Sequence, residues 1–221
     1  MEIRKFRTAY DLELIPASHE GIRPGDLVWD PLFGPPLFAK KGMPNTIYTA
    51  FLDAEMVTKD EWAALQEESR LTPLREAHLA SRTVDVEVKF VSELQHPEIG
   101  KIQGEFFTEK VSKFTFGNLM MRGMDNLIRI RIDHHLEKMK AQKWREYDGR
   151  IRRVFMITEL YYGTIKMVVE KQYSAELDSL LQHTELKAAT KLEGAHAVEY
   201  EFSHDNVPFA MRIERIRTFN G

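Results

Sequence analysis

Two separate regions of this 221-residue chain alternate apolar and charged side chains over strand-length stretches. The first region combines residues 84–91 with 99–107, and the second combines 164–170 with 197–202. A period of two is the period of a β-strand, so each region predicts a ribbon that is apolar on one face and polar on the other. Such a ribbon either covers a water-soluble core or lines a membrane barrel, with lipid on one face and water on the other.

The alternation assigns each side chain to a face. In the first region, one face carries Val84, Val86, Val88 and Phe90, and the other carries Asp85, Glu87 and Lys89. In the second region, Val198, Tyr200 and Phe202 alternate in the same way with Glu199 and Glu201.

Composition limits the classes of protein that fit. Hydrophobic residues make up 43% and charged residues 29% of the chain, a balance that supports a real core. The net charge of −3 argues against nucleic-acid binding, which needs a basic excess. The chain has no cysteine, which excludes disulfides, thiolate catalysis and zinc–cysteine sites. No apolar run reaches the ~18–20 residues of a membrane helix, and residues 1–16 lack a signal-peptide core, so we expect a cytoplasmic protein.

The remaining patterns predict a mixed set of elements. Short strands are expected at 11–16, 27–29, 37–40, 114–116, 128–132 and 154–162, with a closing strand in 207–219. Helices are expected at 58–70, where Thr58 and Glu61 form a capping box, at 134–146 after Asp133, and from Ser174 to about Gln182. Residues 73–81 are a candidate continuation of the first helix. The order predicts one α+β domain over residues 1–221, with a twisted, largely antiparallel sheet and flanking helices.

No motif predicts catalysis or a cofactor. The chain lacks the GxSxG, HExxH, GxxxxGK and GxGxxG patterns. His134 and His135 are adjacent, so on a helix they point about 100° apart and do not grip one metal ion. We therefore expect a protein that is not an enzyme and that needs no cofactor and no metal.

Basic side chains gather in three places. These are Arg4, Lys5 and Arg7; Lys40 and Lys41; and Lys143, Arg145, Arg150, Arg152 and Arg153. Such clusters are either ordinary solvated charge or contacts to anionic lipid, worth roughly 1 kcal/mol for each Lys or Arg near the surface.

Several segments, in order, resemble a known family. They are residues 1–16, ending in DLELIP; 37–45, LFAKKGMPN; FTF at 114–116 followed by IRIRIDHHLEKM at 128–139; 152–171, RRVFMITELYYGTIKMVVEK; and 207–219, VPFAMRIERIRTF. Together they resemble the pore-forming domain of gasdermins. Within that family the chain is most similar to the fungal gasdermin-like "regulator of cell death" proteins, which act in allorecognition.

The resemblance implies a gasdermin-like pore-forming domain without a separate inhibitory domain, and two membrane fingers, at residues 83–107 and 160–202. It implies a protein that binds acidic phospholipids, oligomerises and inserts β-hairpins at the plasma membrane to cause cell death. The implied partner is a second copy or an allelic variant of the same family, with no nucleic acid. Implied lipid-binding residues are Arg4, Lys5, Arg7, Lys40, Lys41, Arg150, Arg152 and Arg153. Implied membrane-inserting residues are Val84, Val86, Val88, Phe90, Ile165, Met167, Val169, Val198, Tyr200 and Phe202.

The alternative is a non-enzymatic lipid- or ligand-binding module that forms no pore. It accounts equally well for the alternating strands and for the lack of catalytic motifs. It predicts a stable monomer with a dry apolar pocket.

Overall fold

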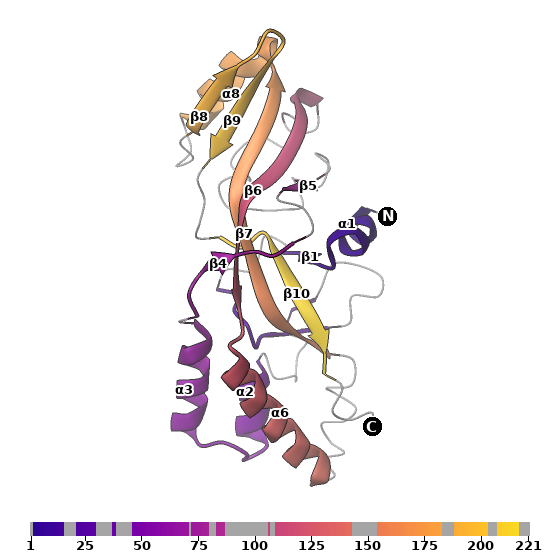
Figure 1. Ribbon diagram of the computed structural model, residues 1–221, viewed down its shortest axis with the longest axis vertical. Coiled ribbons are helices and arrows are strands. Elements are labelled where there is room, and N and C mark those ends of the chain that lie inside the picture. Colours follow the sequence, from indigo (N-terminus) through magenta and orange to yellow (C-terminus); the bar gives the residue numbers. More distant parts are fainter. Residues whose placement is uncertain are drawn as a thin grey trace. The chain divides into compact units, whose positions relative to one another are not determined.

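The computed structural model describes residues 2–15, 21–29, 37–38, 46–70, 72–79, 83–86, 106, 109–142, 154–182, 188–202 and 207–216. Its helices are α1 (Glu2–Tyr10), α2 (Ile47–Asp53), α3 (Lys59–Arg70), α6 (Asn126–Ala141) and α8 (Ser174–Leu181), with a short 3-10 helix, η1 (Lys171–Tyr173) (Figure 1). Its strands are β1 (Glu13–Leu14), β2 (Leu27–Trp29), β3 (Leu37–Phe38), β4 (Arg75–Glu76), β5 (Val84–Val86), β6 (Val111–Gly123), β7 (Val154–Glu170), β8 (Ala188–Glu193), β9 (Ala197–Phe202) and β10 (Ala210–Arg215).

The described strands belong to one sheet, and every pairing with a described register is antiparallel. Helices together with a large antiparallel sheet confirm the predicted α+β class. The chain forms two compact units. Unit 1 comprises Met1–Glu20, Arg75–Met121 and Tyr161–Ala210, and unit 2 comprises Gly21–Leu74, Arg122–Leu160 and Met211–Gly221. The segments of the two units alternate along the chain.

The strand pairing predicted for the second region is confirmed in unit 1. β7 pairs with β9 from Ile165 opposite Phe202 to Glu170 opposite Ala197. On its other edge β9 pairs with β8, the strand that precedes it in the chain and that the sequence pattern did not predict. Because opposite residues in an antiparallel pair share a face, this register brings the apolar side chains of β7 and β9 together.

β7 is longer than either strand predicted from it. The segments 154–162 and 164–170 were separate expectations, and they form one strand through Gly163. A Cβ at Gly163 would lie 2.9 Å from the backbone oxygen of Gly117 on β6 and 3.1 Å from the side chain of Leu119. The glycine therefore marks a close approach of two backbones, not a break in the strand.

β6 changes the phase of its alternation at Asn118. Phe114 and Phe116 point into the core before this residue, and Leu119 and Met121 point into the same core after it. Asn118 has φ +47°, the left-handed conformation that is found at one class of β-bulge. The extra residue keeps both halves of β6 apolar toward the core of unit 1.

Unit 2 packs α2, α3 and α6 around a second core. α3 begins as predicted: the Thr58 hydroxyl accepts from the Glu61 backbone N–H at 3.2 Å, and the Glu61 carboxylate accepts from the Thr58 backbone N–H at 2.8 Å. Leu65 is buried in the core of this unit, as the predicted apolar face of the helix requires.

The prediction of a strand at 128–132 is wrong, because α6 runs through it. On a strand Ile128, Ile130 and Ile132 would share one face. In the structure Ile128 and Ile132 are buried whereas Ile130 is 63% exposed, which is the four-residue spacing of a helix. The Asp125 carboxylate accepts from the Leu127 backbone N–H at 2.7 Å, so the helix begins there and not at Asp133.

Three smaller predictions also fail. Residues 72–79 contain no helix, since Arg75 and Glu76 pair with β6 instead. Ser174 does not cap α8 from outside; it is the first helical residue, and its hydroxyl donates to the Lys171 carbonyl at 2.8 Å. Phe106 has helical backbone, which contradicts the end of the strand expected at 99–107, whereas the rest of that segment lies outside the described residues.

Helix α2 was not predicted at all. Thr46 caps it, accepting from the Thr49 backbone N–H at 3.0 Å, and Ile47, Tyr48 and Phe51 are fully buried. Its seven residues contain β-branched and aromatic side chains that favour strands, so its helical state comes from packing and capping.

Asp26, next to β2, makes the stability of unit 2 depend on pH. Burial raises the pKa of Asp26 to about 6, although the Arg23 backbone N–H donates to its carboxylate at 3.0 Å and opposes the change. A folded-state pKa above the unfolded value of 3.8 means that the folded chain binds the proton more tightly. The associated stabilisation, about 3 kcal/mol, is therefore complete below pH ~4 and is lost as the pH rises through ~6.

We expect Asp26→Asn to remove this dependence. In urea unfolding, the variant should match the unchanged protein near pH 3.5 and exceed its stability by up to about 3 kcal/mol above pH 6.5. Asp133→Asn, at an exposed position of α6, controls for the loss of a surface carboxylate. A constant difference between Asp26→Asn and the unchanged protein across this range would contradict the assignment.

Candidate membrane-inserting surface

The residues predicted to face lipid form one buried face in unit 1. Those that the structure describes are at most 5% exposed: Val84, Val86, Ile165, Met167, Val169, Val198, Tyr200 and Phe202. They belong to a single apolar cluster. Val88 and Phe90 lie outside the described residues. The predicted faces of β5, β7 and β9 are thus confirmed as a continuous apolar surface that the folded chain keeps from water.

Helix α8 covers part of this surface. It follows β7 through η1, and Figure 1 shows it beside β8 and β9. Leu177 is fully buried in the same apolar cluster, and Leu180 and Leu181 pack partly against it. An amphipathic helix of eight residues is therefore a cover for the hairpin face.

Polar contacts attach α8 to the hairpin. The Lys191 ammonium of β8 donates to the Asp178 carboxylate at 2.7 Å, and the Tyr200 hydroxyl lies 3.1 Å from Asp178 and 3.1 Å from the Ser174 carbonyl. The hydrogen bond to Asp178 raises the pKa of Lys191. Burial, followed by the hydrogen bond to Asp178, raises the pKa of Tyr200.

A second contact lies on the other side of α8. Lys110, just before β6, donates to the Glu176 carboxylate at 2.6 Å, which raises the pKa of Lys110. Its ammonium also lies 5.3 Å from the ring centre of Phe106 and 5.5 Å from that of Tyr173. Such a cation–π geometry helps to fix the lysine in place.

The opposite face of the β7–β9 pair is charged. Lys166 of β7 lies 3.0 Å from the Glu201 carboxylate and 3.7 Å from the Glu199 carboxylate of β9. The hydrogen bond to Glu201 raises the pKa of Lys166. On β5, Asp85 lies on this polar side and its carboxylate is 3.6 Å from the Lys113 ammonium. Polar contacts therefore occupy the face that the sequence assigned to water.

Of the residues predicted to bind lipid, the structure describes the side chain of Arg7 alone. Its guanidinium donates to the Glu13 carboxylate at 2.8 Å, and Glu13 is only 3% exposed. Burial raises the pKa of Glu13, while Arg7 opposes the change. Arg7 thus neutralises a buried carboxylate in this state. The backbone of Arg4 and Lys5 lies in α1, and Lys40, Lys41, Arg150, Arg152 and Arg153 lie outside the described residues.

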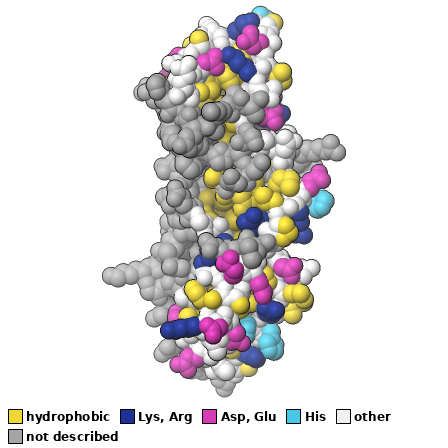
Figure 2. Space-filling view, turned by 90° about the vertical axis from the view of Figure 1, so that its left-hand side faces the viewer, with side chains coloured by type: hydrophobic (Ala, Val, Ile, Leu, Met, Phe, Trp, Pro, Cys, Tyr) yellow, Lys and Arg dark blue, Asp and Glu magenta, His cyan; other side chains and the backbone are white. Residues whose placement is uncertain are grey.

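The described surface carries mixed charge. Figure 2 shows Lys and Arg side chains interspersed with Asp and Glu side chains on the face in view. The described residues of that face thus form no large patch of one sign.

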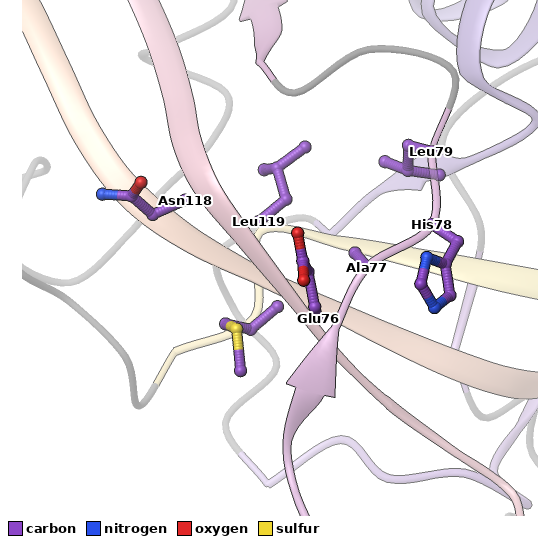
Figure 3. Close-up of a pocket in the computed structure, with 7 residues that line it drawn as sticks. Glu76, Ala77, His78, Leu79, Asn118 and Leu119 are labelled. Atoms are coloured by element: carbon purple, nitrogen blue, oxygen red, sulfur yellow. The ribbon is translucent and has the colours of Figure 1, made fainter.

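A surface pocket of about 680 Å³ lies beside β4 and β6 in unit 1. Figure 3 shows Glu76, Ala77, His78 and Leu79 following one another along β4 and the segment after it, next to β6. Asn118, Leu119 and Met120 complete the lining. The pocket offers one carboxylate, one imidazole and one amide together with apolar side chains.

The described residues contain no group of three or more His, Asp or Glu side chains that could hold a metal ion. None of the described helices is long and apolar enough to cross a membrane.

Sequence reasoning missed the residues that attach α8. Asp178 and Lys191 are brought together by the β8–β9 hairpin, and β8 itself was not expected. The available signal was Gly194-Ala195-His196, a short turn directly before the alternating segment 197–202, which is a pattern typical of a hairpin.

Comparison with known proteins adds no assignment. No protein-family model matches the chain, and no curated protein matches it significantly. The gasdermin resemblance therefore rests on the sequence segments alone.

Proposed function

We propose that this chain is a pore-forming protein that binds acidic membranes, oligomerises and inserts β-hairpins. The observation that carries the proposal is the surface formed by β5, β7 and β9. Its apolar face matches the residues predicted to meet lipid, and its opposite face carries Lys166, Glu199 and Glu201. A strand that crosses a bilayer at the boundary of a pore needs this division between a lipid face and a water face.

The proposed sequence of events starts with the basic segments. Contacts with acidic headgroups, worth roughly 1 kcal/mol for each Lys or Arg, concentrate the protein at the membrane. Helix α8 then leaves the hairpin, which exposes the apolar face to lipid. Strands of neighbouring subunits pair with one another, because an unpaired strand edge is too costly in hydrocarbon.

The proposed partner is a variant of the same family, as the allorecognition resemblance implies. If the strand edges of two different variants fit each other better than the edges of two identical copies do, mixed assembly is favoured over self-assembly. The protein would then reside in the cytoplasm until a variant is present, and would act at the plasma membrane to kill the cell.

The test is dye release from phospholipid vesicles. We expect release from vesicles that contain acidic phospholipid and little release from vesicles of phosphatidylcholine alone. The protein is measured alone and mixed with diverged variants, and the mixture should release dye faster. Absence of release from every vesicle, in every mixture, would overturn the proposal. Equal release by the single protein and the mixture would reject the role of the partner but retain the pore.

The pocket beside β4 and β6 favours one other function, a ligand-binding module without pore formation. Its lining is mixed, with Glu76, His78 and Asn118 beside Leu79 and Leu119, whereas that alternative predicted a dry apolar pocket. Electron microscopy of the protein on acidic vesicles separates the two. Ring-shaped oligomers support the pore, and uniformly dispersed monomers support the binding module.

A further inference from the structure

The attachment of α8 to its sheet depends on a few side chains. Leu177 is the one residue of α8 that is fully buried, and the leucines at 180 and 181 are only partly covered. The helix carries two carboxylates, on Glu176 and Asp178, and both are engaged by lysines from other elements. Few apolar side chains of α8 are therefore buried against the sheet, whereas both of its carboxylates form ion pairs with other elements.

The contacts of Asp178 are the more extensive. Its carboxylate receives the Lys191 ammonium at 2.7 Å from β8 and lies 3.1 Å from the Tyr200 hydroxyl of β9. Lys191 in turn lies 5.4 Å from the centre of the Tyr200 ring and 3.9 Å from the Glu193 carboxylate. Asp178 thus joins α8 to both strands of the β8–β9 hairpin through one carboxylate.

Lys191 stands on the side of the sheet that α8 covers. In the strand register it lies opposite Tyr200, whereas Leu192 lies opposite Glu199 on the charged face. Glu193, opposite Val198, shares this side with Lys191, so β8 brings charged side chains to the face on which β9 is apolar. A lysine there is unfavourable once that face meets lipid, and Asp178 is its nearest partner in the folded chain. The pair therefore favours the state in which α8 is docked.

From these contacts we infer that Asp178, Lys191 and Tyr200 form a latch that holds α8 over the hairpin and sets the threshold for its release. The inference deepens the proposed function, on which its membrane consequence rests. Both ion-pair partners are partly exposed, with side-chain exposures of 43% for Asp178 and 33% for Lys191. An ion pair of this kind is modest in strength and opens reversibly, as a releasable contact must.

The test measures local opening by hydrogen exchange, without a membrane. Asp178→Lys places like charges side by side and should raise the exchange rate of the amides in 174–182 by about tenfold. Asp178→Asn should raise it by about threefold. Adding Lys191→Asp to Asp178→Lys restores opposite charges and should return the rate to near that of the unchanged protein.

A matched control removes a similar contact elsewhere in unit 1. Asp85→Asn on β5 breaks the exposed pair with Lys113 of β6 and should leave exchange in α8 unchanged. Amides of α6 in unit 2 report whether a variant has unfolded as a whole; if Asp178→Lys does so, Asp178→Asn and Tyr200→Phe test the latch.

The same variants on acidic vesicles separate the latch from the pore. Asp178→Lys should shorten the lag before dye release, and the charge exchange should restore it. Faster exchange in α8 with no dye release from any protein supports the latch and overturns the proposed function. Dye release with unchanged exchange in α8 and an unchanged lag overturns the latch and leaves the proposed function standing.

Discussion

In the proposed pores, Glu199→Cys should allow a charged, water-soluble thiol reagent to change the conductance, and Val198→Cys should not. Adjacent residues of β9 point to opposite faces, with Glu199 beside Lys166 and Val198 in the apolar cluster. The chain has no cysteine of its own, so each variant carries a single reactive site. The recording is made in a planar bilayer of acidic phospholipid after pores have formed.

Neither substitution is expected to disturb folding much. Glu199 has a side chain that is 40% exposed, and Val198 to Cys changes a buried side chain only slightly. Before membrane binding, Val198→Cys should also resist a lipid-soluble maleimide, and on vesicles it should react with it. Equal reaction of the two cysteines with the charged reagent would show that β9 does not divide lipid from water in this way.

Phe116→Ala should destabilise the folded chain by about 3–5 kcal/mol, a large fraction of the 5–15 kcal/mol that keeps a typical domain folded. Phe116 is 2% exposed, and its ring stacks on that of Phe209 with centres 3.9 Å apart and an angle of 8°. Phe114 meets it edge-on at 5.4 Å. Truncation would open a cavity between β6 and the segment before β10. The cavity would lie two residues from Asn118, where the backbone of β6 is left-handed.

Urea unfolding measures this loss. Phe116→Leu keeps most of the volume and should cost only about 1 kcal/mol, so the difference between the two variants isolates the cavity. A loss below 1 kcal/mol for Phe116→Ala would mean that these aromatic rings do not form the central contact of unit 1.

Sequence pattern predicted the parts of the fold where burial follows a simple period. Ile165 through Glu170 pair with Ala197 through Phe202 as expected, because both strands bury alternate residues and a one-residue slip would turn the apolar set to solvent. The same two-residue period gave a wrong prediction of a strand at 128–132. Ile130 is exposed there, and its apolar character imitates a strand inside a helix whose buried positions are Ile128 and Ile132.

The contacts of the candidate site were less predictable than its faces. Arg7 belongs to a basic cluster in the sequence, yet its position relative to the buried Glu13 depends on the turn between α1 and β1. Asp178 and Lys191 carry no periodic signal, and only the pairing of β8 with β9 brings them together. Charge pattern alone does not distinguish a lysine that meets a membrane from one that holds a helix.

The left-handed backbone at Asn118 makes the identity of one exposed residue matter for the whole of β6. Phe116 and Leu119 are three residues apart, so in a regular strand they would point to opposite faces. A β-branched residue at 118, which disfavours this conformation, should therefore tend to force either Phe114 and Phe116 or Leu119 and Met121 out of the core. Deletion of residue 118 would instead place Phe116 and Leu119 two residues apart, the spacing at which both face the core without a left-handed residue. Natural variants of this protein that retain the three-residue spacing are therefore expected to carry asparagine, aspartate or glycine at 118.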